Sequence, residues 1–284
     1  LAAQEQVRAV PATSLNYGYM GFNWRDPANA ARPHPLFSDI GIRRALAMAI
    51  DRRALLKNVY DTLAYLGSGP FSRTLATADT ALAMPAFDAA GAGRLLDSLG
   101  WRDGDGDGVR EKGGRPLRFG LMFPATSPPR RRYAELIQAQ LRPVGVQVDV
   151  DGADISVVGE RMFTGKFDAL INNWASDPSP GALRGSWHSA TPANRASNLQ
   201  LYGSAAADAA MDSAANALDP EQGRRLYRAA YQRIADDVAA VWLYENRAFL
   251  ALNRRVQPVP GTDAWWRNLR FWSIPPAGRL PRDR

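Results

Sequence analysis

Carboxylates alternate with glycine in residues 103–108, which read Asp-Gly-Asp-Gly-Asp-Gly. Carboxylates at alternate positions, with glycine at the sixth, form the first half of an EF-hand-type calcium loop. The twelfth position of such a loop needs a bidentate glutamate, but here it is Gly114, and Glu111 at the ninth position compensates only in part. The sequence favours a tight polar turn at Asp103–Asp107 over a calcium site. It does not decide whether the loop binds calcium.

Side chains suited to covalent catalysis are sparse. The chain has no cysteine and only two histidines, His34 and His188. Ser186 and Ser189 flank His188, but catalytic triads are assembled from residues that are distant in the chain. Neither a nucleophile elbow nor a phosphate- or dinucleotide-binding glycine motif occurs. We therefore predict no catalytic residue, no metal ligand, no cofactor and no enzyme activity, with a hydrolase as the distant alternative.

A ligand-binding pattern occupies residues 172–178, which read Asn-Asn-Trp-Ala-Ser-Asp-Pro and begin inside a predicted strand, Phe167–Trp174. In open α/β sheets, ligands bind outside the carboxyl ends of the strands. There Trp174 could contact an apolar part of a ligand and Asp177 a cationic end. The alternative is that Trp174 packs locally and Asp177 caps the next turn. The residue types and their positions support the two interpretations about equally.

The elements that would position this site alternate between strand and helix. The pattern predicts strand 117–123, helix 129–142, strand 146–150, helix 154–164 and strand 167–174. Strands and helices that alternate at this spacing form a parallel sheet with right-handed crossovers. We predict an α/β fold, with a mixed, mostly parallel sheet flanked by helices.

Aspartates mark the starts of further helices on both sides of this segment. Asp39, Asp51 and Asp88 each precede apolar residues at helical spacing, and Gly100 stands where a left-handed residue would end the third helix. Asp219 followed by proline predicts another helix start. Residues 61–86 look irregular, and a helix over 204–216 and one long strand over 240–253 complete the prediction.

The net charge of +7 does not by itself indicate a nucleic-acid partner. All but three of the 35 basic residues are arginine, and they are scattered among acidic residues. A nucleic-acid-binding protein concentrates its basic residues on one face. We therefore predict a solvated basic surface and no nucleic acid. No apolar run is long enough to span a membrane, and residues 1–20 show no signal peptide.

The run 37–52, Phe-Ser-Asp-Ile-Gly-Ile-Arg-Arg-Ala-Leu-Ala-Met-Ala-Ile-Asp-Arg, resembles the signature segment of family 5 solute-binding proteins, which include oligopeptide, dipeptide and nickel receptors. Three further segments match in the family's order. They are Phe87–Trp101 with the acidic loop, Ile137–Leu141 with Val144–Val146, and Phe167-Asp168 leading to Trp174 and Asp177-Pro178.

The resemblance implies the second lobe of a type II periplasmic-binding-protein fold, so we expect the chain to be the C-terminal portion of a longer receptor. Residues 37–245 would form that lobe. Residues 1–36 would be strands and a hinge belonging to the first lobe, and residues 246–284 would return to it. Such receptors work outside the cytoplasm, in the periplasm or at the cell envelope. They close around a ligand and deliver it to the permease subunits of an ABC importer.

In the peptide-binding members, a tryptophan and an aspartate three residues later line the cleft, and the aspartate pairs with the ligand's α-amino group. Trp174 and Asp177 match that spacing. Pro178 departs from the longer loop of those relatives, which leaves a non-peptide solute as the alternative: a metal complex, a sugar or an opine-like compound. Contact with a membrane would occur only through the permease or a lipid anchor outside this chain. The predicted ligand-binding residues are Trp174, Asp177, Asn173 and Asn172.

Overall fold

The structure is a computed structural model that describes residues 6–12, 14–176, 180–189, 191, 197–259 and 269–281. The chain forms two compact units. The larger is Leu15–Glu245, and the smaller combines Leu1–Ser14 with Asn246–Arg284. None of the helices in the described part has the length and hydrophobicity that crossing a membrane requires.

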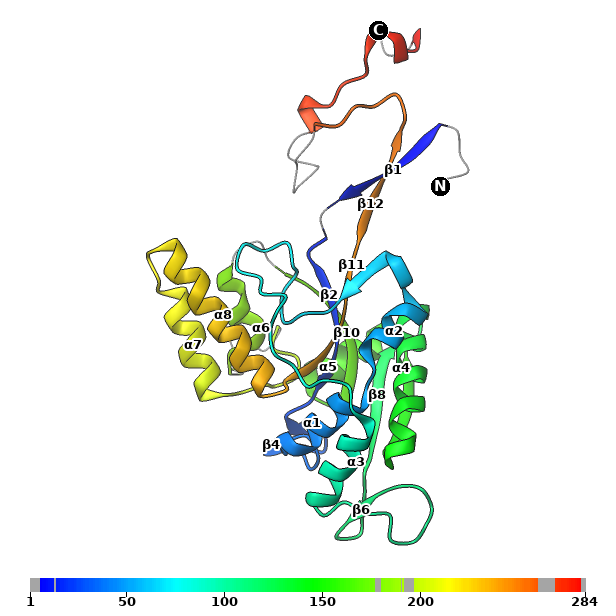
Figure 1. The fold of residues 1–284 in the computed structure, drawn as a ribbon, viewed down its shortest axis with the longest axis vertical. Coiled ribbons are helices and arrows are strands. Elements are labelled where there is room, and N and C mark those ends of the chain that lie inside the picture. The colour runs from blue at the N-terminus through cyan, green and yellow to red at the C-terminus, as the bar shows by residue number, and fades with distance from the viewer. Residues whose placement is uncertain are drawn as a thin grey trace. The chain divides into compact units, whose positions relative to one another are not determined.

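A six-stranded sheet runs through the larger unit (Figure 1). In spatial order its strands are β5 (Ala64–Leu66), β11 (Ala240–Asn246), β2 (Asn16–Phe22), β10 (Ala169–Ala175), β8 (Arg118–Pro124) and β9 (Gln147–Ala153). Strand β8 is parallel to both β9 and β10, whereas β2 is antiparallel to both β10 and β11. The predicted α/β fold with a mixed sheet is confirmed.

Helices cover both faces of this sheet (Figure 1). The first face carries α1 (Ile40–Ala49), α2 (Arg52–Val59), α3 (Ala89–Ser98) and α4 (Pro128–Leu141), whose apolar residues share one core cluster with Phe119 and Ile171 of the sheet. The second face carries α6 (Leu183–Trp187), α7 (Ala205–Ala215) and α8 (Pro220–Asp236), which pack against Tyr17, Tyr19 and Trp242. Helix α5 (Ile155–Thr164) contributes Val158 to a small cluster with Met122 and Leu170.

The aspartates predicted to start helices do so. Asp39 and Asp88 accept backbone hydrogen bonds from Gly41 and Gly91, both at 2.7 Å. Asp51 caps α2 and Asp219 caps α8 in the same manner. Each bond satisfies an N–H group that the helix leaves without a partner, and such a cap contributes about 1 kcal/mol. Gly100 follows α3 with φ +84°, the left-handed conformation predicted for it.

The single strand predicted over 240–253 is wrong. The chain forms two strands, β11 and β12 (Ala248–Asn253), in different sheets. Strand β11 is buried along almost its whole length because helices cover both of its faces, whereas β12 is only partly buried and pairs with β1 (Val7–Ala12) in the smaller unit. Residues 240–253 read as one mostly apolar run, so their pattern does not indicate that the chain leaves one sheet and joins another.

Short hairpins were also missed where the sequence reads as loop. Strands β3 (Arg25–Asp26) and β4 (Asn29–Pro33) pair within the polar segment after β2, and β6 (Glu111–Lys112) pairs with β7 (Arg115–Pro116) after the acidic loop. Strand β5 lies inside the stretch predicted to be irregular. These strands have two to five residues, too few for a period-two pattern to show.

Candidate functional site

A hollow of about 320 Å³ lies at the carboxyl end of β10, and we call it the β10 hollow. Four aromatic residues from four elements line it: Tyr17 of β2, Trp174 of β10, Trp187 of α6 and Tyr231 of α8. All four elements belong to the larger unit. An aromatic surface of this kind can contact an apolar part of a ligand.

The floor of the β10 hollow is held in place by contacts among its aromatic rings. The indole Nε1 of Trp187 donates a hydrogen bond of 3.3 Å to the hydroxyl of Tyr17, and both residues are almost fully buried. Trp187 also meets Trp242 edge-on, with ring centroids 5.1 Å apart. Burial raises the pKa of the Tyr17 hydroxyl well above its ordinary value, so the group stays neutral. The floor is therefore uncharged.

Strand register sets the direction of Trp174. In the antiparallel pair of β2 and β10, Trp174 stands opposite Tyr17 and Asn172 stands opposite Tyr19. Opposite residues project from the same face, and successive residues alternate between faces. Trp174 and Asn172 therefore face α6 to α8, whereas Asn173 projects toward the face covered by α1 to α4.

The predicted site residues thus fall into different positions. Trp174 lines the β10 hollow and is partly exposed. Asn172 is 8% exposed, and its amide donates a hydrogen bond of 3.2 Å to the hydroxyl of Tyr19. Asn173 lies on the other face of the sheet, and Asp177, like Pro178, lies outside the described residues. A ligand-binding role for these four residues stays a prediction.

One wall of the hollow comes from the segment between β5 and α3, where Pro70 and Leu75 line it. The backbone N–H of Ser72 donates to the hydroxyl of Ser176 at 2.8 Å, and the N–H of Ser176 donates to the carbonyl of Leu15 at 2.7 Å. The wall is thereby connected to the residue that follows β10 and to the start of β2.

An ion pair with a buried carboxylate fixes this wall to β11. Glu245 is 2% exposed, and one of its carboxylate oxygens accepts from the backbone N–H of Arg73 at 2.6 Å. The other oxygen lies 3.3 Å from the guanidinium of Arg73 and accepts from Ser68. Sequence reasoning missed this contact because 172 positions separate Arg73 from Glu245 and the wall segment shows no periodicity.

The comparisons with known proteins decide the family. Residues 1–196 match the model of the family described as "Bacterial extracellular solute-binding proteins, family 5 Middle". The chain belongs to this family. Its predicted assignment from four ordered sequence segments is confirmed.

Two curated relatives show how much of a family 5 protein the chain represents. It is 27% identical to the oligopeptide-binding protein AppA of Bacillus subtilis (strain 168) over 256 residues, which are 88% of this chain and 45% of AppA. It is 27% identical to the nickel-binding periplasmic protein of Escherichia coli (strain K12) over 207 residues, which are 72% of this chain and 39% of that protein. The chain spans less than half the length of these relatives.

A solved structure matches the fold. The structure of AppA from Bacillus subtilis in complex with a nonapeptide superposes with a TM-score of 0.80 at 25% identity. The match covers 95% of this chain and 53% of that one. The fold is therefore that of the type II periplasmic binding proteins, as predicted.

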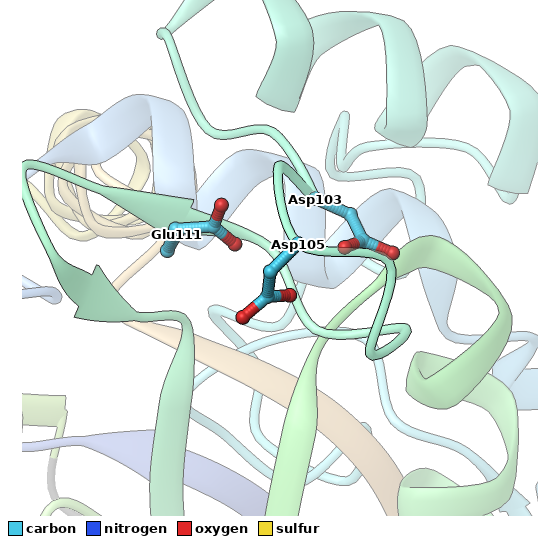
Figure 2. Close-up of side chains that lie close together, drawn as sticks. All are labelled: Asp103, Asp105 and Glu111. Carbon is cyan, nitrogen blue, oxygen red and sulfur yellow. The ribbon is translucent and has the colours of Figure 1, made fainter.

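The acidic loop of this family 5 chain is an exposed turn next to β6 (Figure 2). Carboxylate oxygens of Asp103, Asp105 and Glu111 lie within 4.8 Å of one another. The carboxylates accept backbone hydrogen bonds inside the loop: Asp103 from Gly106 at 2.7 Å, and Glu111 from Gly104 at 2.6 Å. These bonds are those of a tight polar turn, and calcium binding stays an untested alternative.

The two histidines make structural contacts. His34 is almost fully buried, and its Nδ1 accepts hydrogen bonds from the N–H groups of Leu36 and Phe37, so Nε2 carries the proton and donates to Asp168 at 3.1 Å. His188 lies 3.7 Å from Asp208 and 3.5 Å from another carboxylate of α7. Nothing in these contacts activates a serine.

Proposed function

We propose that the chain is the ligand-holding lobe of an extracytoplasmic receptor that captures a small solute and delivers it to the permease subunits of an ABC importer. The observation that carries the proposal is the β10 hollow: an aromatic pocket at a carboxyl strand end, on the family 5 fold. Ligands of open α/β sheets bind at this edge. The periplasm or the outer face of the cell envelope is the compartment that fits this role.

Peptides are the first solute class that we propose. The AppA structure contains a nonapeptide, and AppA is called oligopeptide-binding. In a peptide complex Trp174 would contact the apolar part of the ligand, and Asp177 would form a charge-assisted hydrogen bond to its ammonium group. The lobes of such a receptor close when the closed form makes contacts that the open form lacks.

Calorimetry of the purified protein tests both the function and the role of Asp177. Removing one partner of a buried hydrogen-bonded charge pair costs about 2–5 kcal/mol, so Asp177→Asn should weaken binding of peptides with a free amino terminus by at least about thirtyfold. The control Asp105→Asn changes a carboxylate in the exposed acidic loop and should leave affinity unchanged. Equal affinity of parent and Asp177→Asn for all such peptides would exclude Asp177 from the site.

A non-peptide solute is the second candidate. It is favoured by the nickel-binding relative, which has the same 27% identity as AppA, although over 207 residues and not 256. A metal complex, a sugar or an opine-like compound would then occupy the site. Mass spectrometry of small molecules that copurify with the protein separates the candidates, and a protein that retains and binds no solute of any class would contradict the receptor function itself.

A further inference from the structure

We propose that Arg52 is a positioning residue for the β10 hollow. Its guanidinium holds both ends of the segment Gly67–Met84, which we call the strap, and the middle of the strap shapes the hollow. This inference rests on the proposed function and adds to it a residue that acts on the ligand site through other residues. Three observations carry it: the contacts of the guanidinium, the close approach of the strap to β11, and the contacts of the strap with α8.

The strap has no regular structure of its own. Residues 67–88, all of which the structure describes, form neither a helix nor a strand. Figure 1 shows this segment, in cyan, leaving β5 and passing beside α8 before it enters α3. Irregular segments of this length are uncommon in compact domains and are usually functional. Without a backbone ladder, the strap depends for its position on a few contacts with its neighbours.

One nitrogen atom of Arg52 contacts both ends of the strap. Arg52 is the first residue of α2, and its Nη1 donates to the carbonyl of Gly67 at 3.0 Å. The same atom lies 3.8 Å from the sulfur of Met84, a weaker contact, and donates to the carbonyl of Trp242 in β11 at 2.9 Å. Hydrogen bonds from a charged donor are stronger than those between neutral groups. The guanidinium therefore connects both strap ends to the sheet.

The first end of the strap lies directly against the backbone of β11. The N–H of Gly67 donates to the carbonyl of Leu243 at 3.3 Å. A Cβ at Gly67 would lie 2.9–3.0 Å from backbone atoms of residues 242–244. Backbone atoms of a central strand cannot rotate away as a side chain can, so this approach requires glycine. The bond from Arg52 and the contact with β11 fix this end from two sides.

The middle of the strap shapes the hollow. Pro70 and Leu75 line it directly. The hydroxyl of Thr77 lies 2.9 Å from the hydroxyl of Tyr231, which also lines the hollow, and the ring of Phe71 packs against the Tyr231 ring with centroids 4.5 Å apart. A displaced strap would therefore move two lining residues and remove partners of a third.

The second half of the strap is bound to α8 through one side chain. Gln232 accepts a hydrogen bond from the backbone N–H of Ala83 and donates one to its carbonyl, both at 3.2 Å. Both hydrogen bonds are exposed to solvent. Because this contact lies next to Met84, a covalent link between positions 83 and 232 can replace the hold that Arg52 exerts on this end.

Amide exchange and calorimetry of Arg52→Met test the inference. The variant removes the charged donor and keeps an unbranched side chain, so exchange in residues 67–84 should become at least about tenfold faster. Binding of a pool of Ala-X-Ala tripeptides should weaken by at least about threefold, because affinity falls with the fraction of molecules whose strap is in place. The control Arg53→Met changes the exposed neighbour on α2 and should alter neither measurement.

A cross-link separates positioning of the site from general stability. The chain has no cysteine, so a short bismaleimide joins only the two thiols of the variant Ala83→Cys, Gln232→Cys. In the Arg52→Met background the link should restore most of the lost affinity, although the hydrogen bonds of Arg52 are still missing. In the parent background it should leave affinity unchanged. A residue that contributes to stability alone would show no such recovery.

A second variant disturbs the same anchor without changing Arg52, so the test does not depend on the folding of Arg52→Met. Gly67→Ala places a methyl group against the backbone of β11 and should give the same faster exchange in the strap and the same weaker binding. Gly93→Ala in α3 is its control, because the nearest atom to a Cβ there lies 3.6 Å away.

The outcomes separate this inference from the receptor function. Equal exchange in the strap of Arg52→Met and Arg53→Met, faster exchange with unchanged affinity, or lost affinity that the cross-link does not restore would overturn the inference and leave the receptor function standing. A parent protein that binds neither the tripeptide pool nor a copurified solute would remove both.

Discussion

Trp174 of β10 stands directly opposite Tyr17 of β2 in an antiparallel pair, and both rings line the same hollow. This pairing brings together residues at positions 17 and 174, so two of the aromatic residues that line the hollow belong to neighbouring strands of one sheet. The position of the indole is thereby set by backbone hydrogen bonds of two central strands. A change at Trp174 should act on the ligand more than on the fold, because the side chain is partly exposed.

Trp174→Ala should therefore weaken ligand binding by roughly tenfold and leave the melting temperature within a few degrees of the parent. The loss reflects one aromatic contact and its buried area. Calorimetry and thermal unfolding measure the two effects. Trp272→Ala, in the smaller unit, is the control that should not change affinity. A large loss of stability with unchanged affinity of the folded protein would assign Trp174 a packing role only.

Gly18 should tolerate no side chain. A Cβ at this position would lie 2.1–2.5 Å from three ring atoms of Tyr244, which packs across the strand. Overpacking of this kind costs about 1–3 kcal/mol, so Gly18→Ala should lower the free energy of unfolding by that amount. Gly159 in α5 has open space where a Cβ would lie, and Gly159→Ala should be neutral or stabilise by up to about 1 kcal/mol. Denaturant titration of both variants measures these changes in the free energy of unfolding.

Arg43 should be required for stability, unlike its neighbour Arg44. Arg43 is 2% exposed, and its guanidinium donates to the carbonyls of Phe37, Asp237 and Val238 and lies 4.1 Å above the ring of Trp24. Burial lowers its pKa to about 10, so it stays charged at neutral pH.

The variant Arg43→Met leaves those carbonyls without their donor, and an unsatisfied buried polar group costs about 1–3 kcal/mol. We expect a loss of about 3 kcal/mol or more in the free energy of unfolding, measured by denaturant titration. Arg44→Met changes an exposed side chain one position along α1 and should cost less than about 0.5 kcal/mol. Similar losses for both variants would contradict the structural role of Arg43.

These residues show how far the sequence alone reaches. Helix caps such as Asp39 and Asp219 were predicted correctly because each depends on a hydrogen bond to a backbone group two or three positions away. The β10 hollow could be predicted only at Trp174, where a strand ends beside a polar segment. Its other aromatic residues, Tyr17, Trp187 and Tyr231, come from elements far apart in the chain, and no local sequence pattern indicates that they meet.

Asp168 should make stability depend on acid pH. Burial raises the pKa of its carboxyl, but hydrogen bonds from His34 and from the N–H of Gly120 outweigh burial and hold the pKa below its usual value. Because the folded-state pKa lies below the unfolded value of about 3.9, the ionised group stabilises the protein above that value. This contribution is lost as pH falls through the folded-state pKa.

Asp168→Asn should accordingly lower the free energy of unfolding at pH 7, and its difference from the parent should shrink between about pH 5 and pH 3. Urea titrations across this range measure the trend. His34→Gln combined with Asp168→Asn should cost less than the sum of the single variants, because the two side chains contact each other. A difference between parent and Asp168→Asn that stays constant with pH would show that the carboxylate's charge does not matter.

Glu245 should control the mobility of the pocket wall. Its carboxylate is buried and holds both the backbone N–H and the guanidinium of Arg73, which places Ser72 against Ser176. Glu245→Gln removes the charge from this contact and leaves the guanidinium of Arg73 without a carboxylate partner. Breaking a buried pair is more costly than breaking an exposed one. We expect faster amide exchange in residues 67–75 and weaker ligand binding, with β9 unchanged.

Glu135→Gln is the matched control for this variant, because Glu135 forms an exposed pair with Arg132 on α4. It should leave amide exchange in the wall unchanged, since an exposed pair contributes little and lies on another element. Equal exchange in the wall of parent and Glu245→Gln would show that the wall keeps its position without the ion pair. The contact between Ser72 and Ser176 and the packing of Leu75 would then be sufficient to hold it.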